Sequence, residues 1–249
     1  MRSITRNIKN IRQIALGVLQ ALKSAILLTY ARVQAARKVA RLCAIVALVL
    51  VADAGFAVSE KVLHAVALKY GEPARSRVEG WGKLIQKETS LYQDKEENTL
   101  TRANDYFNQV RWLSDLEHWG REDYWATPVE TLATNGGDCE DFSIGKYFSL
   151  LQSEFDPNKL RITYVKSLTY DQAHMVLAYY ERPDAEPLIL DNINKKVLPA
   201  SQRPDLLPIY SFNGDSIWLA RDRGRKLKGS SQKSLPQWKA LNERMFSDK

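Results

Sequence analysis

Long hydrophobic runs are missing from this chain. The most apolar stretch, residues 42–52, has about ten residues, whereas a helix that spans a bilayer of about 30 Å needs about 20. Basic residues precede this stretch and small residues follow it, as in a secretory signal with a basic, an apolar and a cleavage region. We therefore expect residues 1–57 to be a signal peptide cleaved after Ala54 or Ala57, or a retained membrane anchor.

Acidic residues are almost absent from this leader, and an excess of basic residues is absent from the rest. Residues 1–54 hold nine Lys and Arg side chains against one acidic residue, Asp53. The remaining residues hold 27 basic and 28 acidic side chains, so the net charge of +7 belongs to the leader. The main body thus lacks the basic character of nucleic-acid-binding domains, and we expect no nucleic-acid partner.

Cysteine is also scarce, since the chain holds only Cys43 and Cys139. Cys43 lies in the apolar part of the leader and would be removed with a cleaved signal. An exported protein would then keep a single cysteine in an oxidising compartment. One leftover thiol in such a protein is a candidate nucleophile or a partner for an intermolecular disulfide. A buried structural cysteine is the alternative.

Cys139 lies at the predicted start of a helix. Asn135, Gly136 and Gly137 are typical of a sharp turn. Apolar residues then recur at steps of three and four, as on the buried face of an amphipathic helix: Ile144, Tyr147, Phe148, Leu151 and Phe155. The free N–H groups and the dipole at a helix start favour a thiolate over a thiol. The backbone N–H of Cys139 is also the default oxyanion donor, with Asn135 or Trp125 as a possible second donor.

Helical patterns come first along the chain and strand patterns second. We expect helices over 74–92 and 99–116, and a short helix capped by Thr127 with Pro128 at its first position. After Pro157 the apolar period changes to two, which predicts strands over 160–165, 173–180, 187–190, 209–212 and 217–220. This order indicates an α+β domain over 58–223, in which the cysteine helix packs on an antiparallel sheet. Residues 224–234 read as a mobile linker and Trp238 as part of a last short helix, so 224–249 form a C-terminal appendage.

A thiolate nucleophile needs a base, and the base needs a group that orients it. The chain has three histidines, and His174 begins a predicted strand. Asp191 follows the next strand, so a hairpin would bring both residues toward the same end of the sheet. A hairpin symmetric about Asp184 would place Asp191 opposite Leu177, roughly 10 Å from His174 along the strand. Direct contact therefore requires a shifted register or a bulge.

Three acids surround the cysteine: Asp138, Glu140 and Asp141. Negative charge beside a thiol raises its pKa, which is unfavourable for thiolate formation. One explanation is that first-turn acids complement the helix dipole. The other is a hard cation with oxygen ligands, although the spacing is not that of an EF-hand loop.

Three sequence segments together resemble the bacterial transglutaminase-like cysteine proteases. They are Tyr124-Trp125-Ala126-Thr127-Pro128, Gly137-Asp138-Cys139-Glu140-Asp141 and Lys146-Tyr147-Phe148, followed by His174 and Asp191. The resemblance covers about residues 74–220. It implies a papain/transglutaminase-like fold with Cys139 as nucleophile, His174 as base and then acid, and Asp191 as the residue that orients the imidazole.

The same resemblance implies a biological role. It implies a periplasmic cysteine endopeptidase whose calcium ion is held by Asp138 and Glu140, and also by Asp141. The expected substrate is the N-terminal region of a large surface adhesin, whose release promotes biofilm dispersal, and the expected partner is an inner-membrane cyclic-di-GMP receptor that sequesters the protease. The same triad also supports acyl transfer by a transglutaminase or amidase. A non-catalytic binding module is the remaining alternative.

Overall fold

The computed structural model describes residues 58–90, 96–214, 216–220, 225–226 and 231–247. The predicted signal peptide or anchor, with its two cleavage sites, lies outside these residues. Among the described residues, no helix combines the length and the apolarity needed to cross a membrane. All described residues belong to one compact unit, 55–249.

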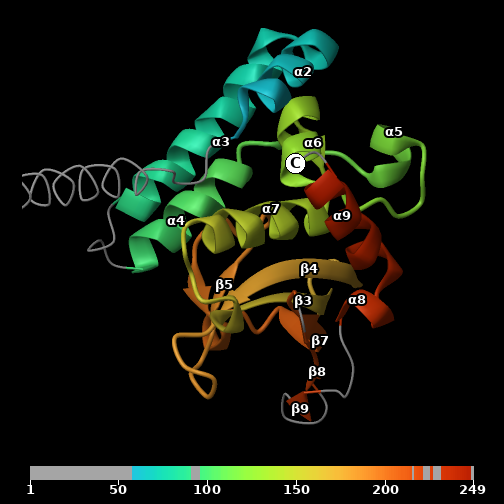
Figure 1. Ribbon diagram of the computed structural model, residues 1–249. Helices are drawn as coiled ribbons and strands as arrows, with labels where there is room; N and C mark the ends of the chain where they lie inside the picture. The colour runs from blue at the N-terminus through green and yellow to red at the C-terminus, as the bar shows by residue number, and fades with distance from the viewer. Residues whose placement is uncertain (1–57, 91–95, 215, 221–224, 227–230, 248–249) are drawn as a thin grey trace, which may run out of the picture. The chain divides into compact units, whose positions relative to one another are not determined.

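Helices form the first half of this unit (Figure 1). Their bounds are α2 Glu60–Tyr70, α3 Glu72–Ser90, α4 Glu96–Phe107, α5 Asp115–Trp119, α6 Pro128–Thr134 and α7 Cys139–Gln152. The start of α6 follows the predicted capping chemistry, because Thr127 and Glu130 form a capping box and Pro128 occupies the first turn. Two short strands, β1 Arg111–Trp112 and β2 Gly136–Gly137, pair in parallel between these helices.

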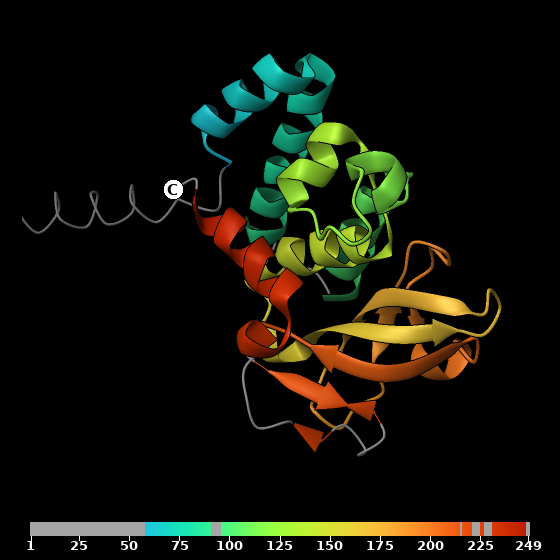
Figure 2. The same ribbon diagram turned by 90° about the vertical axis from the view of Figure 1, so that its right-hand side faces the viewer.

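The second half forms a seven-stranded sheet in the order β6-β5-β4-β3-β7-β8-β9, with antiparallel neighbours. The strand bounds are β3 Leu160–Ser167, β4 Gln172–Tyr179, β5 Leu188–Leu190, β6 Leu198–Pro199, β7 Leu206–Phe212, β8 Ile217–Leu219 and β9 Arg225–Lys226. The five strands expected from the sequence correspond to β3, β4, β5, β7 and β8. Figure 2 shows the helices gathered on one side of this sheet.

The cysteine helix α7 packs on the central strands β3 and β4, which confirms the predicted architecture. Ser143 fixes the contact, because its Oγ lies 3.0 Å from the carbonyl oxygen of Met175 in β4 and 2.9 Å from that of Cys139. On the opposite side of α7, the indole N–H of Trp81 donates to Ser149 Oγ at 2.8 Å. Helix α7 is therefore held between the sheet and the other helices, and its first residue has a fixed position.

The helix predicted over 99–116 is wrong in its second half. Helix α4 ends at Phe107, and Arg111–Trp112 form β1. The apolar residue Val110 keeps helical spacing with Phe107 and is buried in the same cluster, yet it lies in a turn in which its N–H donates to the Phe107 carbonyl oxygen at 3.0 Å. Parallel pairing of Arg111–Trp112 with Gly136–Gly137 takes the place of further helix, and it leaves Trp112 and Leu116 exposed.

The stretch expected as a linker contains regular structure where it is described. Residues 225–226 form β9, and Ser231–Ser234 form the short helix α8. Ser231 is fully buried and donates a hydrogen bond to the Gly214 carbonyl oxygen at 2.8 Å. The last helix, α9 Pro236–Ser247, inserts Trp238 into the core, stacked on Phe148 with ring centroids 5.9 Å apart.

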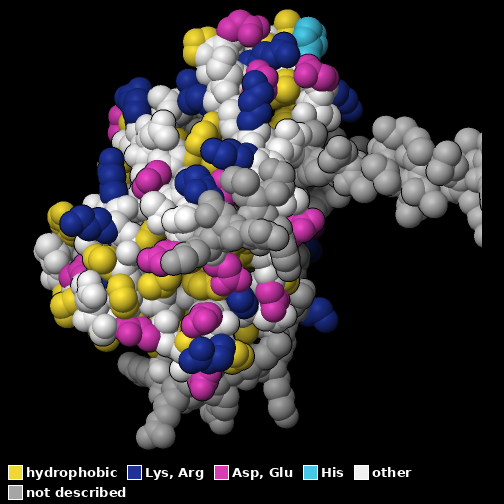
Figure 3. All heavy atoms as spheres, turned by 90° about the vertical axis from the view of Figure 1, so that its left-hand side faces the viewer, with side chains coloured by type: hydrophobic (Ala, Val, Ile, Leu, Met, Phe, Trp, Pro, Cys, Tyr) yellow, Lys and Arg dark blue, Asp and Glu magenta, His cyan; other side chains and the backbone are white. Residues whose placement is uncertain are grey.

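Charged side chains of both signs are interspersed over the face shown in Figure 3. On this face, the described residues form no extended patch of one sign. The nearly equal numbers of acidic and basic residues outside the leader thus correspond to a mixture of both charges on this surface.

We predict that Gly145→Ala destabilises the fold. A Cβ at this position of α7 would lie 2.1 Å from the Phe107 ring, which is fully buried. Overpacking of this kind costs about 1–3 kcal/mol, more than the roughly 1 kcal/mol that alanine gains in helix propensity. Urea unfolding measures the difference. Adding Phe107→Leu to the Gly145→Ala variant should restore part of the loss, and a single variant as stable as wild type would contradict this account of the α4–α7 contact.

Candidate active site

A tight junction places Cys139 at the start of α7. Asn135 adopts a left-handed conformation with φ of 54° and ends α6. Gly137 must lack a side chain, because a Cβ there would lie 2.6 Å from Asp141 Oδ2. Asp141 is fully buried and accepts the backbone N–H of Ala126 at 2.7 Å and of Asp138 at 3.4 Å. The prediction that Cys139 lies at the start of a helix is therefore confirmed, and the hydrogen bonds of Asp141 stabilise this junction.

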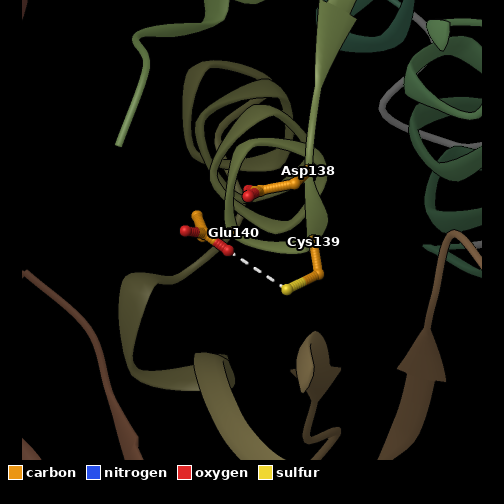
Figure 4. A group of neighbouring side chains, drawn as sticks. All are labelled: Asp138, Cys139 and Glu140. Carbon is orange, nitrogen blue, oxygen red and sulfur yellow. Dashed lines mark hydrogen bonds between the residues drawn. The ribbon is translucent and has the colours of Figure 1, made fainter. Parts of the chain in front are cut away.

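The thiol of Cys139 is engaged by its own neighbour. Its Sγ donates to Glu140 Oε2 at 3.1 Å, and Figure 4 shows the Asp138 carboxylate on the same side as Glu140. Burial raises the pKa of the Cys139 thiol well above its usual range, and the negative charges of Glu140 and Asp138 raise it further. These effects oppose the thiolate that the helix start favours, as expected of acids without a compensating cation.

His174 and Asp191 form the contact that the symmetric hairpin would have prevented. The distance between His174 Nε2 and Asp191 Oδ1 is 2.8 Å, and both side chains are buried. Strand β5 pairs Leu190 with Leu177, so the register differs by one residue from the symmetric one. Asp191 therefore takes the next position, opposite Val176, on the same face as His174, and the two residues meet as a diagonal cross-strand pair.

Arg203 completes this pair, and sequence reasoning missed it. Its Nη2 lies 2.7 Å from Asp191 Oδ2 and 2.8 Å from Asp205 Oδ2. Burial opposes ionisation of Asp191, but hydrogen bonds from His174, from the Ile193 N–H and from Arg203 outweigh it and hold the Asp191 pKa below its usual range. Asp191 is therefore ionised and holds the His174 ring through Nε2. Nδ1 is the ring nitrogen that Asp191 does not engage. The buried arginine lies 12 residues after Asp191, and no periodic signal marks it.

Cys139 and His174 line one cleft of about 470 Å³. Asp138 lines it as well, together with a ring of further residues: Trp112, Tyr170, Gln172, Ala173, Asn192 and Ile193. The helix side and the sheet side of the fold thus each supply one wall. A thiol on one wall and an imidazole on the other, with its second nitrogen held by a carboxylate, is an arrangement suited to nucleophilic attack on an acyl carbon.

Neither of the two side chains considered as a second oxyanion donor gains support. The indole N–H of Trp125 donates to Asp123 Oδ1 at 2.9 Å, so it is engaged elsewhere. Asn135 is not among the residues that line the cleft. The backbone N–H of Cys139, in the first turn of α7, has no acceptor within its own helix and stays the expected donor.

The acids beside Cys139 belong to a larger cluster. Asp115, at the start of α5, and Asp123, in the following loop, join them. In each of three groupings, carboxylate oxygens or the Cys139 sulfur lie within 4.8 Å of one another: Asp138, Cys139 and Glu140; Asp115, Asp138 and Asp141; and Asp115, Asp123 and Glu140. Sequence reasoning missed Asp115 and Asp123 because they lie at least 15 residues before Asp138 in the sequence.

This cluster fits a hard cation. Asp115 Oδ1 and Asp138 Oδ1 are buried and have no hydrogen-bond partner among the described residues. Burial and the charges of Asp138 and Asp123 raise the Asp115 pKa to about 6, against the Tyr124 N–H, which lowers it. Burial and the charges of Glu140 and Asp123 raise the Asp138 pKa to about 8. Carboxylate oxygens are the ligands that calcium prefers, and Asp138, Glu140, Asp115 and Asp123 would hold the ion. Asp141 already accepts two backbone N–H groups, so its predicted role as a ligand stays a prediction.

We predict that calcium-stripped protein loses stability as the pH rises from about 4 to about 8. An acid whose pKa is raised on folding binds more protons in the native state than in the unfolded state, so the free energy of unfolding falls across the window between its two pKa values. For Asp115 and Asp138 the native values are about 6 and about 8. Urea unfolding at several pH values measures the slope. Saturating Ca²⁺ or the Asp138→Asn substitution should flatten it, whereas stability that rises with pH in stripped protein would contradict the repulsive cluster.

Comparison with known proteins identifies solved structures with a similar sequence and fold. A structure of Legionella pneumophila LapG treated with EGTA is 43% identical in sequence, with a TM-score of 0.66, and the match covers 76% of this chain and 98% of that one. The calcium-bound structure of Legionella pneumophila LapG is 42% identical, with a TM-score of 0.63, and covers 76% and 99%. Among curated proteins no match is found.

The family profile that matches extends over residues 77–212 and so includes α7, the hairpin of His174 and the segment of Asp191. Its description is that of a bacterial transglutaminase-like cysteine proteinase. The mixed fold of helices and antiparallel sheet is that of LapG and of the transglutaminase-like proteins. By profile and by fold, this chain belongs to the bacterial transglutaminase-like cysteine proteinases.

Proposed function

We propose that this protein is a calcium-dependent cysteine endopeptidase in which Cys139, His174 and Asp191 act as the triad. The observation that carries the proposal is the buried His174–Asp191 hydrogen bond of 2.8 Å in the wall of the cleft that Cys139 also lines. Membership of a cysteine proteinase family supports a peptide bond as the target. It favours water over an amine as the acyl acceptor, and hence a protease over a transglutaminase.

The proposed reaction uses these side chains in the following order. His174 Nδ1 takes the proton of the Cys139 thiol, and Sγ attacks the carbonyl carbon of the scissile peptide bond. The N–H of Cys139 donates to the oxyanion. The imidazolium, held by the Asp191 carboxylate, gives its proton to the leaving amine, and a thioester forms. Water activated by His174 then releases the acyl group and restores the thiol.

The acidic cluster supports the calcium requirement. A bound cation would supply positive charge beside Cys139 that lowers the cost of forming the thiolate. The hydrogen bond between Cys139 and Glu140 adds a second reason. A Glu140 carboxylate committed to a cation is no longer the best acceptor for the thiol, which can then turn to His174. That LapG was solved both calcium-bound and EGTA-treated supports the same ion for this chain.

The proposal extends to place and substrate. The leader, with its basic region, apolar region and small residues, supports export to the periplasm. The likeness to LapG supports, as substrate, the N-terminal region of a large surface adhesin, whose cleavage releases the adhesin and disperses a biofilm. By the same likeness, we propose that an inner-membrane cyclic-di-GMP receptor sequesters the enzyme.

The test is cleavage of a recombinant adhesin N-terminal region from the same bacterium, followed by mass spectrometry of the fragments. We expect wild type to cut it in Ca²⁺ and His174→Ala to lose at least about 10³-fold in rate, because the thiol then has no base. His64→Ala is the matched control, since His64 is exposed on α2. Full activity of His174→Ala, or incorporation of an added amine without cleavage, would contradict the protease assignment.

A further inference from the structure

Three large apolar side chains stand open to solvent around the candidate nucleophile. Trp112 is 59% exposed, Tyr170 is 58% exposed and Ile193 is 41% exposed, and all three line the cleft of Cys139 and His174. They come from separate parts of the chain: Trp112 from β1, Tyr170 from the turn between β3 and β4, and Ile193 from the segment after β5. We call these three side chains the apolar rim.

Other contacts hold the three segments of this rim in the fold. Both residues of β1 are exposed, and the segment is anchored instead by the buried Val110 and by the hydrogen bond from the Leu113 N–H to the Gly137 carbonyl oxygen at 2.9 Å. The turn of Tyr170 is held by its backbone, whose N–H donates to Ser167 Oγ at 3.4 Å. The Ile193 N–H donates to Asp191 Oδ1 at 3.0 Å. In each case buried neighbours or hydrogen bonds hold the backbone in place, and the apolar side chain is exposed in the cleft.

Most of the cleft lining carries no charge. Beside the Cys139–His174 pair and Asp138, the lining consists of the rim itself and of Gln172, Ala173 and Asn192. An apolar side chain of a bound segment would cover the exposed surface of the rim.

We propose that Trp112, Tyr170 and Ile193 select the substrate by binding apolar side chains on either side of the scissile peptide bond of an extended protein segment. This rests on the proposed protease function and names its substrate class: extended segments with apolar side chains near the cut. The occupant follows from continuity with the nucleophile, since the rim lines the same cleft as Cys139 and His174. Trp and Tyr in such positions typically dominate the binding energy of an interface.

The experiment uses the full chain with Ca²⁺ and a library of peptides from a digested bacterial proteome, with cut sites read by mass spectrometry. We expect apolar residues to be enriched within about three positions of the cut. For the best peptide, Trp112→Ser and Ile193→Ser should each raise KM roughly tenfold with kcat within about twofold, because they remove binding surface and no reacting group. Trp112→Phe should restore most of the affinity.

Leu68→Ser is the matched control, because Leu68 is 76% exposed on α2 and does not line the cleft. Alkylation of Cys139 by iodoacetamide should proceed at the wild-type rate in all variants. Two results would overturn the rim as the specificity site. One is cleavage by wild type without preference for apolar residues, and the other is that both rim variants keep the wild-type preference and the wild-type KM. No cleavage of any peptide by wild type would instead overturn the proposed function and, with it, the rim as a substrate site.

Discussion

Cleavage by Cys139→Ala should fall below about 1% of the wild-type rate, since loss of a nucleophile typically costs many orders of magnitude. The remaining His174–Asp191 pair has no second nucleophile in the cleft, because the other lining side chains carry no thiol or aliphatic hydroxyl group. Folding should change little, because Cys139 is only partly buried and alanine fits the first turn of α7. Fragment analysis measures the rate, and near-ultraviolet circular dichroism checks the fold.

A second measurement identifies the thiol directly. In the described unit, which spans residues 55–249, Cys139 is the one cysteine of the sequence. In protein without the leader, iodoacetamide should therefore add a single mass label at Cys139, and activity should fall in step with labelling. A protein fully labelled at Cys139 yet fully active, or a Cys139→Ala variant that keeps more than about 1% of its activity, would remove Cys139 from the role of nucleophile.

Chelation should have an effect of comparable size. We expect EGTA to stop cleavage, added Ca²⁺ to restore it, and Mg²⁺ to restore it poorly. Mg²⁺ is a poor substitute because it demands tighter octahedral geometry and releases its waters reluctantly. The physical reason is the uncompensated negative charge of Asp138 and Glu140, which disfavours the thiolate of Cys139. Asp138→Ala and Glu140→Ala should each lose cleavage with Cys139 still present.

Calorimetry and thermal unfolding separate metal binding from catalysis. Calcium should raise the melting temperature of wild type, since a ligand that binds only the native state stabilises it by mass action. The rise should be lost in Asp138→Ala and Glu140→Ala but kept in Glu122→Ala, whose exposed carboxylate neighbours Asp123 and joins none of the clusters. If wild type binds no Ca²⁺ at millimolar concentration, the calcium hypothesis is wrong and the acids serve the helix dipole.

Local signals predicted the position of the cysteine because the relevant physics is local. The turn at Asn135, the glycines and the apolar period of α7 all lie within about 20 residues, and each leaves a mark in the sequence. The capping of α6 by Thr127 was predictable for the same reason. The helix predicted through Leu116 failed because a spacing of three or four does not distinguish a longer helix from a turn followed by a short strand, here β1 paired with β2.

The His174–Asp191 contact depended on a single residue of register. The symmetric hairpin would have put Asp191 on the face opposite to His174, whereas the observed pairing of Leu177 with Leu190 puts both on one face. Turn length sets this register, and a loop with several turn-forming residues does not reveal it. Arg203, Asp115 and Asp123 were beyond prediction, because only the tertiary fold brings them to the site.

The last helix has a practical consequence for anyone who modifies the end of the chain. In α9, Gln237 donates to Asp123 Oδ2 at 2.7 Å, and Arg244 donates to the carbonyl oxygen of Trp125. The loop that supplies an acid to the cluster is therefore tied to the carboxyl-terminal end of the protein. A truncation before α9, or an affinity tag that displaces α9, would break these two contacts and so disturb the loop that supplies Asp123 to the acidic cluster. A tag at the amino-terminal side of the folded unit leaves these two bonds untouched.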